Sequence, residues 1–480
     1  MERQITNNEI FLSGAFINNP EAEKCEVNVN LKTVFLTQDG NQSLKDEILK
    51  IIESSSIVLK VCSFIITDSQ IYEALKKKLE TSSVAVFILT QLDTSKISNT
   101  SLITEDEARE QTSVQHLSYI KALYDKGAHV RASTIAHAKF LVADRAKGFI
   151  MSANFTTPSL NLNTESGAYL SNKCSLELDK LFDVVFLKGT TYRKYLTATQ
   201  KNKQLIVHND AFVKQEWLPQ VSHSNLRYTY DDLTHNLLEE IISIIKTSKQ
   251  FIYLSTYSIV GLEHLSLLTT ELDCAIKRGV SVFIFCRGMN YRPDHLKGVS
   301  ILSKIGCVVF ADYYNHSKGI INETTGMIFT ANVDGYHGLT NGFEVGFILD
   351  EIQRSEFLQV HKNLIASSNY KFILTPKRAD LFSTYELYEK SKGIKAPVFE
   401  NYLSISLKKA IYHLKEEFEE HPLFFAFVKG KMNETYIVTA NNCFKCVYLD
   451  GTITVNEKAN LNYNMEKYLL KYQNLKIEYT

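Results

Sequence analysis

The chain has 480 residues, and its 45% hydrophobic and 22% charged content is ordinary for a globular protein of two or three domains. Its 53 lysines and arginines balance its 53 aspartates and glutamates, which excludes a global positive field, so any electrostatic attraction for nucleic acid must come from a local basic groove. The sequence has neither a secretory start nor an apolar run of the roughly 18 residues that cross a membrane, and its eight cysteines are scattered, so we expect a cytoplasmic protein with reduced thiols and no integral membrane association.

The first part of the chain alternates helix and strand patterns. Residues 1–30 are polar and rich in asparagine, and they are predicted to form an N-terminal arm. A helix is expected over 44–52, where apolar residues fall at helical spacing. Two apolar runs, 57–66 and 84–89, are short and β-branched enough to be buried strands, with a helix between them at 71–79. This order predicts parallel strands covered by helices.

The same order of elements returns in the second half of the chain. The helix pattern of 44–52 recurs 193 residues later, at 237–245, and an apolar strand recurs 196 residues after its first copy. In each half a glycine, Gly127 or Gly306, follows a predicted helix and precedes a histidine by ten residues, which suits a helix C-cap. We infer a duplicated structural unit.

The last residues of the chain follow a different pattern. An amphipathic helix is expected over 402–420, and short strands are expected over 423–429, 435–440 and 445–449, with a hairpin turn at Asp450–Gly451. The predicted organisation is therefore an N-terminal arm (1–30), a first lobe (31–190), a second lobe (191–388) and a small α+β domain of unknown role (396–480).

Two copies of a polar pattern stand at matching places in the two halves. The first is His137-Ala-Lys139 followed by Asp144, and the second is His316-Ser-Lys318 followed by Glu323. Each continues with a hydroxyl residue and an asparagine, and then with a glutamate 28 residues after its histidine. These later residues are Ser152, Asn154 and Glu165 in the first half and Thr330, Asn332 and Glu344 in the second.

The paired patterns resemble those of the phospholipase D superfamily, which contains phospholipases, phosphatidyl transferases and nucleases acting on phosphodiester bonds. The resemblance covers approximately residues 31–385. It implies two similar α/β lobes, each a mixed, mostly parallel sheet flanked by helices, related by a pseudo-two-fold axis at which the histidines meet. The chain departs from the superfamily at Met151, where glycine is usual, and at Glu323, which replaces aspartate. It departs again at Asn332, which lies one residue closer to its histidine than Asn154 does.

This resemblance implies phosphodiester cleavage through a phosphohistidine. A phosphodiester is anionic, so the catalyst must supply a nucleophile, neutralise the phosphoryl oxygens and protonate the leaving oxygen. Imidazole, with a pKa of about 6.5, serves as nucleophile or as acid near neutral pH. We favour His137 as the nucleophile because the first pattern is the closer match. This chemistry requires no metal ion and no cofactor, and Cys443 and Cys446, which would point to opposite faces of a strand, suit a zinc site poorly.

The remaining polar residues are assigned roles around the two histidines. Lys139 and Lys318 would share a strand face with the histidines, and their charges are expected to bind the phosphoryl oxygens together with the amides of Asn154 and Asn332. The corresponding glutamates in the superfamily hold the imidazole nitrogen that does not react, and Glu165 and Glu344 are expected to do the same. The residues expected to support the site are Asp144, Ser152, Glu323 and Thr330.

The function we expect is a metal-independent intracellular nuclease that serves restriction or anti-phage defence. Its expected partners are nucleic acid, with DNA favoured, and a protein such as a helicase or an ATPase. The first alternative is a phospholipase D or phosphatidyl transferase acting on lipid head groups, which predicts an apolar rim at the cleft instead of a rim of lysine and arginine. The second is a phosphate-binding module whose catalytic site has decayed, as Glu323 and the shifted Asn332 allow.

Overall fold

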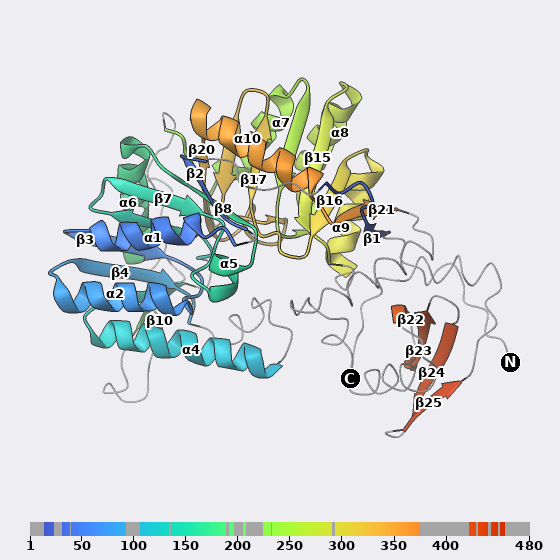
Figure 1. The fold of residues 1–480 in the computed structure, drawn as a ribbon, viewed down its shortest axis with the longest axis horizontal. Helices are drawn as coiled ribbons and strands as arrows, with labels where there is room; N and C mark the ends of the chain where they lie inside the picture. The colour runs from blue at the N-terminus through green and yellow to red at the C-terminus, as the bar shows by residue number, and fades with distance from the viewer. Residues whose placement is uncertain are drawn as a thin grey trace.

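The computed structural model describes two α/β lobes and a separate four-stranded sheet (Figure 1). It describes residues 14–23, 31–38, 40–92, 106–133, 136–188, 192–195, 205–207, 224–231, 233–289, 293–374, 422–428, 431–439, 443–449 and 452–456.

The first lobe is built on a nine-stranded sheet. In spatial order its strands are β10 (Leu205–Val207), β9 (Tyr192–Tyr195), β5 (His129–Ser133), β4 (Ala85–Thr90), β3 (Val58–Cys62), β6 (Phe140–Ala143), β7 (Lys147–Met151), β8 (Glu165–Tyr169) and β2 (Val34–Thr37). Its helices are α1 (Ser43–Ser54), α2 (Ser69–Thr81), α4 (Asp106–Asp125), α5 (Thr157–Asn161) and α6 (Asn172–Lys188). The predicted helices at 44–52 and 71–79 are therefore confirmed as α1 and α2, and the strand at 84–89 as β4.

The second lobe is built on a ten-stranded sheet. In spatial order its strands are β1 (Ala15–Asn18), β21 (Tyr370–Ile373), β16 (Val308–Asp312), β15 (Ser281–Arg287), β13 (Phe251–Ser255), β17 (Gly319–Asn322), β18 (Gly326–Phe329), β20 (Phe343–Ile348), β11 (Leu226–Tyr230) and β12 (Thr234–His235). Its helices are α7 (Asn236–Thr247), the 3-10 turn η3 (Leu262–His264), α8 (Ser266–Lys277), α9 (Pro293–Lys304) and α10 (Glu351–Ala366). A short pair, β14 (Ile259–Val260) and β19 (Val333–Asp334), lies outside this sheet.

The duplication inferred from the sequence is visible in the order of the strands. The series β5-β4-β3-β6-β7-β8 of the first lobe matches β16-β15-β13-β17-β18-β20 of the second. Gly127 and Gly306, at the ends of α4 and α9, both have the left-handed backbone that favours glycine, with φ of 102° and 106°. The predicted C-caps are therefore confirmed.

The sheets are mixed, as expected, but parallel pairing is more limited than the sequence suggested. Within the described parts of the two sheets, parallel pairing is confined to β3, β4 and β5 and to β13, β15 and β16, where α2 and α4, or α8 and α9, return the chain to the same edge of the sheet. The other pairs in both sheets are antiparallel, since short hairpin connections join strands such as β6 and β7. The predicted run 57–66 also yields a strand only over Val58–Cys62, after which the chain leaves the sheet.

Two boundaries of the sheets differ from the predicted organisation. Strands β9 and β10 follow residue 190 but extend the sheet of the first lobe, so the predicted boundary falls before that sheet is complete. Strand β1 comes from the predicted N-terminal arm and pairs with β21 at the edge of the second lobe. The arm therefore contributes a strand to the lobe that is farther from it in sequence.

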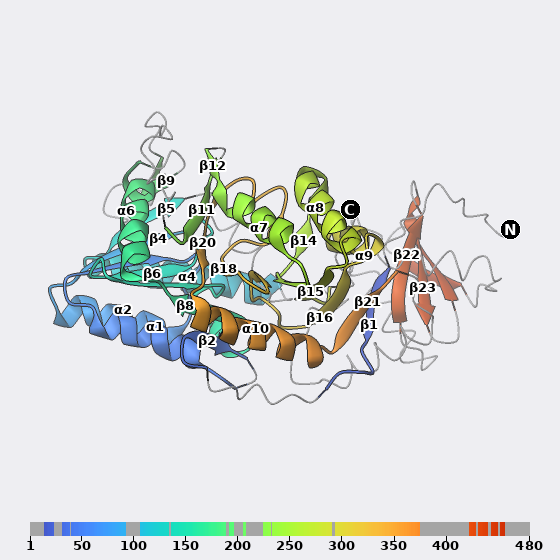
Figure 2. The same cartoon turned by 90° about the horizontal axis from the view of Figure 1, so that it is seen from above.

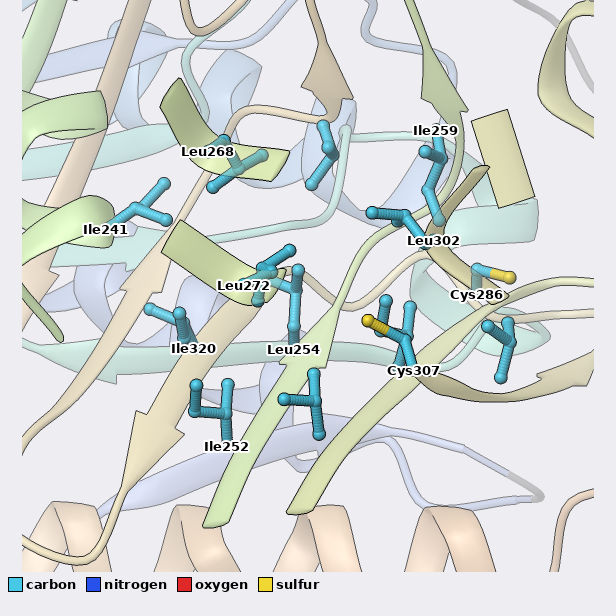
Figure 3. Packing of buried hydrophobic residues seen from close by; sticks show 14 of the residues in the cluster. Ile241, Ile252, Leu254, Ile259, Leu268, Leu272, Cys286, Leu302, Cys307 and Ile320 are labelled. Carbon is cyan, nitrogen blue, oxygen red and sulfur yellow. The ribbon is translucent and has the colours of Figure 1, made fainter. Parts of the chain in front are cut away.

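A shared core joins the two lobes and fixes their relative position. One apolar cluster contains Phe140 and Phe182 of the first lobe together with Tyr228, Phe343 and Phe357 of the second. The rings of Phe140 and Phe343 meet edge to face, with centroids 6.2 Å apart. Figure 2 shows the two lobes adjacent along this boundary. The separate core of the second lobe, drawn in Figure 3, packs helix α8 onto strands β13 and β15.

The C-terminal sheet is antiparallel, with strands β22 (Pro422–Val428), β23 (Lys431–Thr439), β24 (Cys443–Leu449) and β25 (Thr452–Asn456). These strands overlap all three segments predicted in this part of the chain. The predicted helix 402–420 and the turn at Asp450–Gly451 lie outside the described residues. Within the described part of the chain, none of the helices combines the length and the apolar character needed to span a bilayer.

Candidate active site

Backbone hydrogen bonds between the lobes hold the two histidines at the interface. His137 immediately precedes Ala138, and the amides of both residues donate to the carbonyl of Phe343 in the second lobe, at 3.1 and 2.9 Å. The amide of His316 donates to the carbonyl of Thr164 in the first lobe, at 2.9 Å. Each histidine is therefore anchored next to a glutamate of the opposite lobe. Phe343 precedes Glu344 in β20, and Thr164 precedes Glu165 at the start of β8.

The glutamates are exchanged between the lobes. Nδ1 of His137 lies 2.6 Å from Oε1 of Glu344, and Nδ1 of His316 lies 2.8 Å from Oε1 of Glu165. Both carboxylates are buried. Because a carboxylate accepts the Nδ1 proton in each pair, the Nε2 atom of each imidazole remains for chemistry. The structure thus brings all four predicted residues together, in pairs that cross the interface.

Hydroxyl groups hold the second oxygen of each glutamate. The Ser152 hydroxyl donates to Oε2 of Glu165 at 2.5 Å, and the Thr330 hydroxyl donates to Oε2 of Glu344. In each case the hydroxyl comes from the same lobe as the glutamate. Each hydroxyl therefore holds the glutamate of its own lobe in the orientation in which that glutamate contacts the histidine of the other lobe. Ser152 and Thr330 thus occupy matching supporting positions.

The two lysines lie buried beside the imidazoles. Nζ of Lys139 is 2.9 Å from Nδ1 of His137, and Nζ of Lys318 is 3.1 Å from Nδ1 of His316. Each Nδ1 proton is directed to a glutamate, so each ammonium donates instead to the carbonyl oxygen of its histidine. Lys139 and Lys318 therefore bring two positive charges into a site shared by both lobes.

Burial and mutual charge set the protonation states of these groups. Burial lowers the pKa of Lys318 to about 7, and it also lowers the pKa of Lys139. Burial and the neighbouring lysines lower the pKa of His137, and they lower that of His316 to about 4 despite the opposing charge of Glu165. Both imidazoles are therefore neutral at pH 7, as a nucleophile requires.

The glutamates remain ionised for a different reason. Burial would raise the pKa of Glu344, but its electrostatic interactions with His137 and Lys139 and its hydrogen bonds from His137 and Thr330 outweigh burial and lower the pKa to about 2. The pKa of Glu165 is lowered in the same way, against burial, by His316 and Lys318 and by the Ser152 hydroxyl.

The asparagines of the motif follow strands β7 and β18. The Oδ1 atoms of Asn154 and Asn332 are buried and have no hydrogen-bond partner among the described residues. Asn332 keeps this property although it lies one residue closer to its histidine. Their predicted role in binding phosphoryl oxygens stays a prediction.

Asp144 and Glu323 lie away from the imidazoles, at the far ends of β6 and β17. The Asp144 carboxylate accepts hydrogen bonds from the backbone amides of Ser56, Ile57 and Val58, at 2.9, 2.7 and 2.9 Å. The Glu323 carboxylate accepts one from the amide of Lys249, at 2.6 Å. Both positions suit the supporting role expected for these residues.

Sequence reasoning missed two aromatic residues beside the histidines. The ring of Phe64 lies edge-on to His137 with centroids 5.4 Å apart, and Tyr257 lies edge-on to His316 at 5.1 Å. Phe64 and Tyr257 are 193 residues apart, which is the spacing of the first helices of the two lobes. Extending the repeat residue by residue would have found them.

Two further buried histidines hold the loops that carry these aromatic residues. Nδ1 of His116 accepts from the amide of Ile66 at 3.0 Å, and Nδ1 of His295 accepts from the amide of Ile259 at 3.0 Å. Nε2 of His116 donates to the carbonyl of Gln91, which follows strand β4. Nε2 of His295 donates to the carbonyl of Arg287, which ends strand β15. His116 and His295 are 179 residues apart, as are His137 and His316.

The described residues contain no group of three or more histidine, cysteine, aspartate or glutamate side chains placed to hold a metal ion. The candidate site is instead a set of imidazoles, carboxylates and ammonium groups shared equally by the two lobes.

Residues 48–187 match a protein-family model described as "Cardiolipin synthase, PLD-like domain". This match runs from within α1 to within α6 and includes the complete first motif. This stretch of the chain is therefore similar to phospholipase D-like domains. The second motif, from His316 to Glu344, lies outside the matched residues. No curated protein sequence matches the chain.

The fold of this chain is similar to that of a solved phosphatidylserine synthase, and two further structures are less similar. The phosphatidylserine synthase of Haemophilus influenzae Rd KW20 is 13% identical, with a TM-score of 0.50, and the match covers 80% of this chain and 96% of that one. The polyphosphate kinase of Porphyromonas gingivalis is 16% identical over 68% of this chain and 50% of that one, with a TM-score of 0.42. The phospholipase D family member Nuc of Salmonella typhimurium is 19% identical over 30% of this chain and 95% of that one, with a TM-score of 0.26.

Proposed function

We propose that the protein is a phosphodiesterase that cleaves its substrate through a phosphohistidine, without a metal ion. The observation that carries this proposal is the pair of imidazoles, each with its Nδ1 atom held by a buried glutamate and its Nε2 atom left for chemistry. Lys139 and Lys318 supply the positive charge that a phosphoryl group needs as it is transferred. The second set of contacts is as complete as the first, which argues against a decayed site.

In the first step, Nε2 of His137 attacks phosphorus and forms a P–N bond, while the P–O bond to the leaving alcohol breaks. His316 gives its Nε2 proton to the departing oxygen. In the second step, His316 removes a proton from water, the water oxygen bonds to phosphorus, and the P–N bond breaks. The negative charge of the bound phosphodiester opposes that of the lysines, so substrate binding raises the pKa of His316 and allows it to act as the acid.

His137 is proposed as the nucleophile because its side chain is the more accessible of the two. It is 28% exposed, against 11% for His316. A substrate with a 4-nitrophenolate leaving group, which departs without a proton, separates the two roles. The His316→Ala variant should release one equivalent of nitrophenolate and accumulate a phosphohistidine, whereas His137→Ala should give no burst. The opposite result would assign the roles the other way round.

For the substrate we propose nucleic acid, with DNA favoured. Partly exposed Tyr257 beside His316 and exposed Tyr336, on the loop that follows Asn332, offer ring surfaces of the kind on which bases stack. The proposal extends to a nuclease in restriction or phage defence that works with a helicase or ATPase.

The competing proposal is transfer or hydrolysis of lipid head groups. It is favoured by the description of the matched family model, which names cardiolipin synthase. In that case the second step would use a lipid alcohol in place of water, with the same two histidines.

One experiment separates these proposals. The purified protein is incubated in excess EDTA with labelled single- and double-stranded DNA, RNA and phosphatidylcholine vesicles. The His137→Ala variant and a control, His129→Ala, which changes an exposed histidine at the start of β5, are assayed in parallel. Cleavage of nucleic acid that survives EDTA, persists in the control and vanishes in His137→Ala supports the nuclease. Turnover of lipid alone supports the head-group enzyme, and inactivity on every substrate contradicts both.

A further inference from the structure

A buried arginine without an ion-pair partner lies beside the candidate active site. Arg287 ends strand β15 and is 3% exposed, and its Nε and Nη1 atoms have no hydrogen-bond partner in the part of the chain that the structure describes. No carboxylate of the described residues lies within ion-pair distance of its guanidinium. A buried charge in this condition is costly, and native structures normally supply a partner for it. A bound anion would supply the partner that the guanidinium lacks.

The guanidinium is connected to His316 through a single aromatic ring. Its Cζ atom lies 5.5 Å from the centroid of Tyr257, and that ring meets the imidazole of His316 at 5.1 Å. The amide of Arg287 also donates to the carbonyl of Tyr257, at 3.2 Å. This cation–π contact compensates part of the charge but uses none of the N–H donors in the plane of the guanidinium.

A second unused donor lies on the loop that follows the neighbouring strand, β16. The hydroxyl of Tyr314, two residues before His316, is buried and has no hydrogen-bond partner among the residues described. Burial raises the pKa of Tyr314 to about 12, and the nearby charge of Arg287 opposes this rise. The phenol is therefore protonated and able to donate, close enough to Arg287 for the two groups to interact electrostatically.

The acid that faces Arg287 on the next strand interacts with its charge but is already engaged in hydrogen bonds. Asp312 pairs with Arg287 in the register of the parallel strands β15 and β16. Its carboxylate accepts hydrogen bonds from the amides of Tyr313 and Tyr314 and from the side chain of Asn369. Asp312 thus holds the loop that leads to His316, and it leaves the Arg287 donors unused.

The first lobe has no equivalent of this cluster. Gln91 stands at the place of Arg287, 196 residues earlier, which is the spacing of the repeated strands. Its Oε1 atom accepts the amide of Leu92 at 2.9 Å, so the side chain binds its own loop. The unused donors are therefore found on the His316 side of the site and not on the His137 side, so the two halves of the site are not equivalent.

We propose that Arg287 and Tyr314 form an anion subsite beside His316, which binds a second negatively charged group of the substrate next to the scissile phosphodiester. This inference rests on the proposed phosphodiesterase function and specifies its substrate. In a nucleic acid the second anion is the neighbouring phosphate. In a lipid it is a charged group of the head group, such as the carboxylate of serine.

The test compares substrates that differ only in the second anion. For nucleic acid these are the thymidine dinucleotide with one internal phosphodiester and its forms with an added 5′-phosphate or 3′-phosphate. For lipid they are phosphatidylserine and phosphatidylethanolamine, which differ by one carboxylate. In the wild type, one added anion should raise kcat/KM by about 10- to 100-fold, the range for a charge-assisted hydrogen bond.

Arg287→Gln should bring the ratio of kcat/KM with and without the second anion close to one. Tyr314→Phe should lower this ratio part of the way. Glutamine is the residue that the first lobe carries at this position, so the fold accommodates it. Arg227→Gln is the matched control, because Arg227 pairs with Glu240 at 2.9 Å outside the cluster, and its ratio should stay at the wild-type value. Arg287→Lys, which keeps the charge, should retain part of the preference.

Each outcome has a separate meaning for the two proposals. A preference seen only between the two lipids, and lost in Arg287→Gln, would keep the subsite and reject the nuclease. If no substrate is turned over, the phosphodiesterase proposal fails, and the same compounds are then titrated calorimetrically against His137→Ala with and without Arg287→Gln. Equal rates or affinities with and without the second anion, or a preference that survives Arg287→Gln, would overturn the subsite.

Discussion

Nδ1 of His137 lies 2.6 Å from Oε1 of Glu344, a residue 207 positions later in the chain and in the opposite lobe. The equivalent contact joins His316 to Glu165 in the other direction. The histidine of each lobe is therefore oriented by the glutamate of the other lobe. One set of polar groups per lobe is insufficient for catalysis in this arrangement, and the shared apolar core around Phe140 and Phe343 maintains the alignment of both sets.

This exchange predicts which catalytic step each glutamate supports. Glu344→Gln should slow the nitrophenolate burst, because it disturbs the proposed nucleophile His137. Glu165→Gln should spare the burst and slow the later turnover, because it disturbs His316. Losses of about 10- to 100-fold are expected for residues that orient a functional imidazole. Rapid-quench kinetics measures both phases. If the histidine variants confirm His137 as the nucleophile, the reverse assignment of phases would mean that each glutamate serves the histidine of its own lobe.

The lysine beside His316 should produce an alkaline limb in the pH–rate profile. Burial lowers the pKa of Lys318 to about 7, so the free enzyme loses a phosphate-binding charge as the pH rises through that value. We expect kcat/KM to fall above pH 7, and kcat to fall only at higher pH, since a bound phosphodiester stabilises the ammonium. Lys318→Arg keeps its charge at all these pH values and should remove the limb, whatever its effect on the overall rate. A kcat/KM that stays constant from pH 6 to pH 9 would contradict this role.

The sequence was sufficient to predict the two lobes and the main site residues because both depend on local, repeated patterns. The helix over Ser43–Ser54 has its buried residues at the spacing that the sequence displays, and its copy at Asn236–Thr247 repeats it. The motif residues were found because polar side chains recur at equal distances from His137 and His316. These signals are contained in the order of residues and need no knowledge of packing.

Long-range pairing could not be read in the same way. The exchange of Glu165 and Glu344 depends on how two lobes pack, and equal spacing along the chain is compatible with either pairing. Strand β1 is four residues long, so its pattern gave no indication of its partner β21 near residue 370. The unused donors of Arg287 are likewise a property of burial, which only the folded arrangement reveals.

The buried histidine His316 should make the protein less stable in acid. Its pKa is about 4 in the folded state and about 6.5 when unfolded, so the unfolded chain binds more protons between these values. The stabilisation is complete above pH 6.5 and is lost as the pH falls toward 4. Glu344, with a pKa of about 2 when folded, contributes in the same direction at lower pH.

Urea unfolding at several pH values from 4 to 7.5 tests this expectation. Stability should rise with pH across that interval, and His316→Asn should reduce the slope. It should not abolish it, because burial also lowers the pKa of His116, and lowers that of His361 to about 4. His129→Asn, at an exposed position, should keep the full slope. Equal slopes in wild type and His316→Asn would show that His316 does not couple folding to protonation.

The acidic residues at the ends of the two motifs should affect stability to different extents. Asp144 accepts hydrogen bonds from three backbone amides, and Glu323 from one. Asp144→Ala leaves these amides at the start of β3 without their acceptor and should lower the free energy of unfolding by about 1–3 kcal/mol. Glu323→Ala should cost about 0.5–1.5 kcal/mol, the range for a single bond. Chemical denaturation measures both losses, and kcat per folded molecule should change far less than in His137→Ala. A kcat loss in Asp144→Ala that matches His137→Ala, with stability unchanged, would instead place Asp144 in the chemistry.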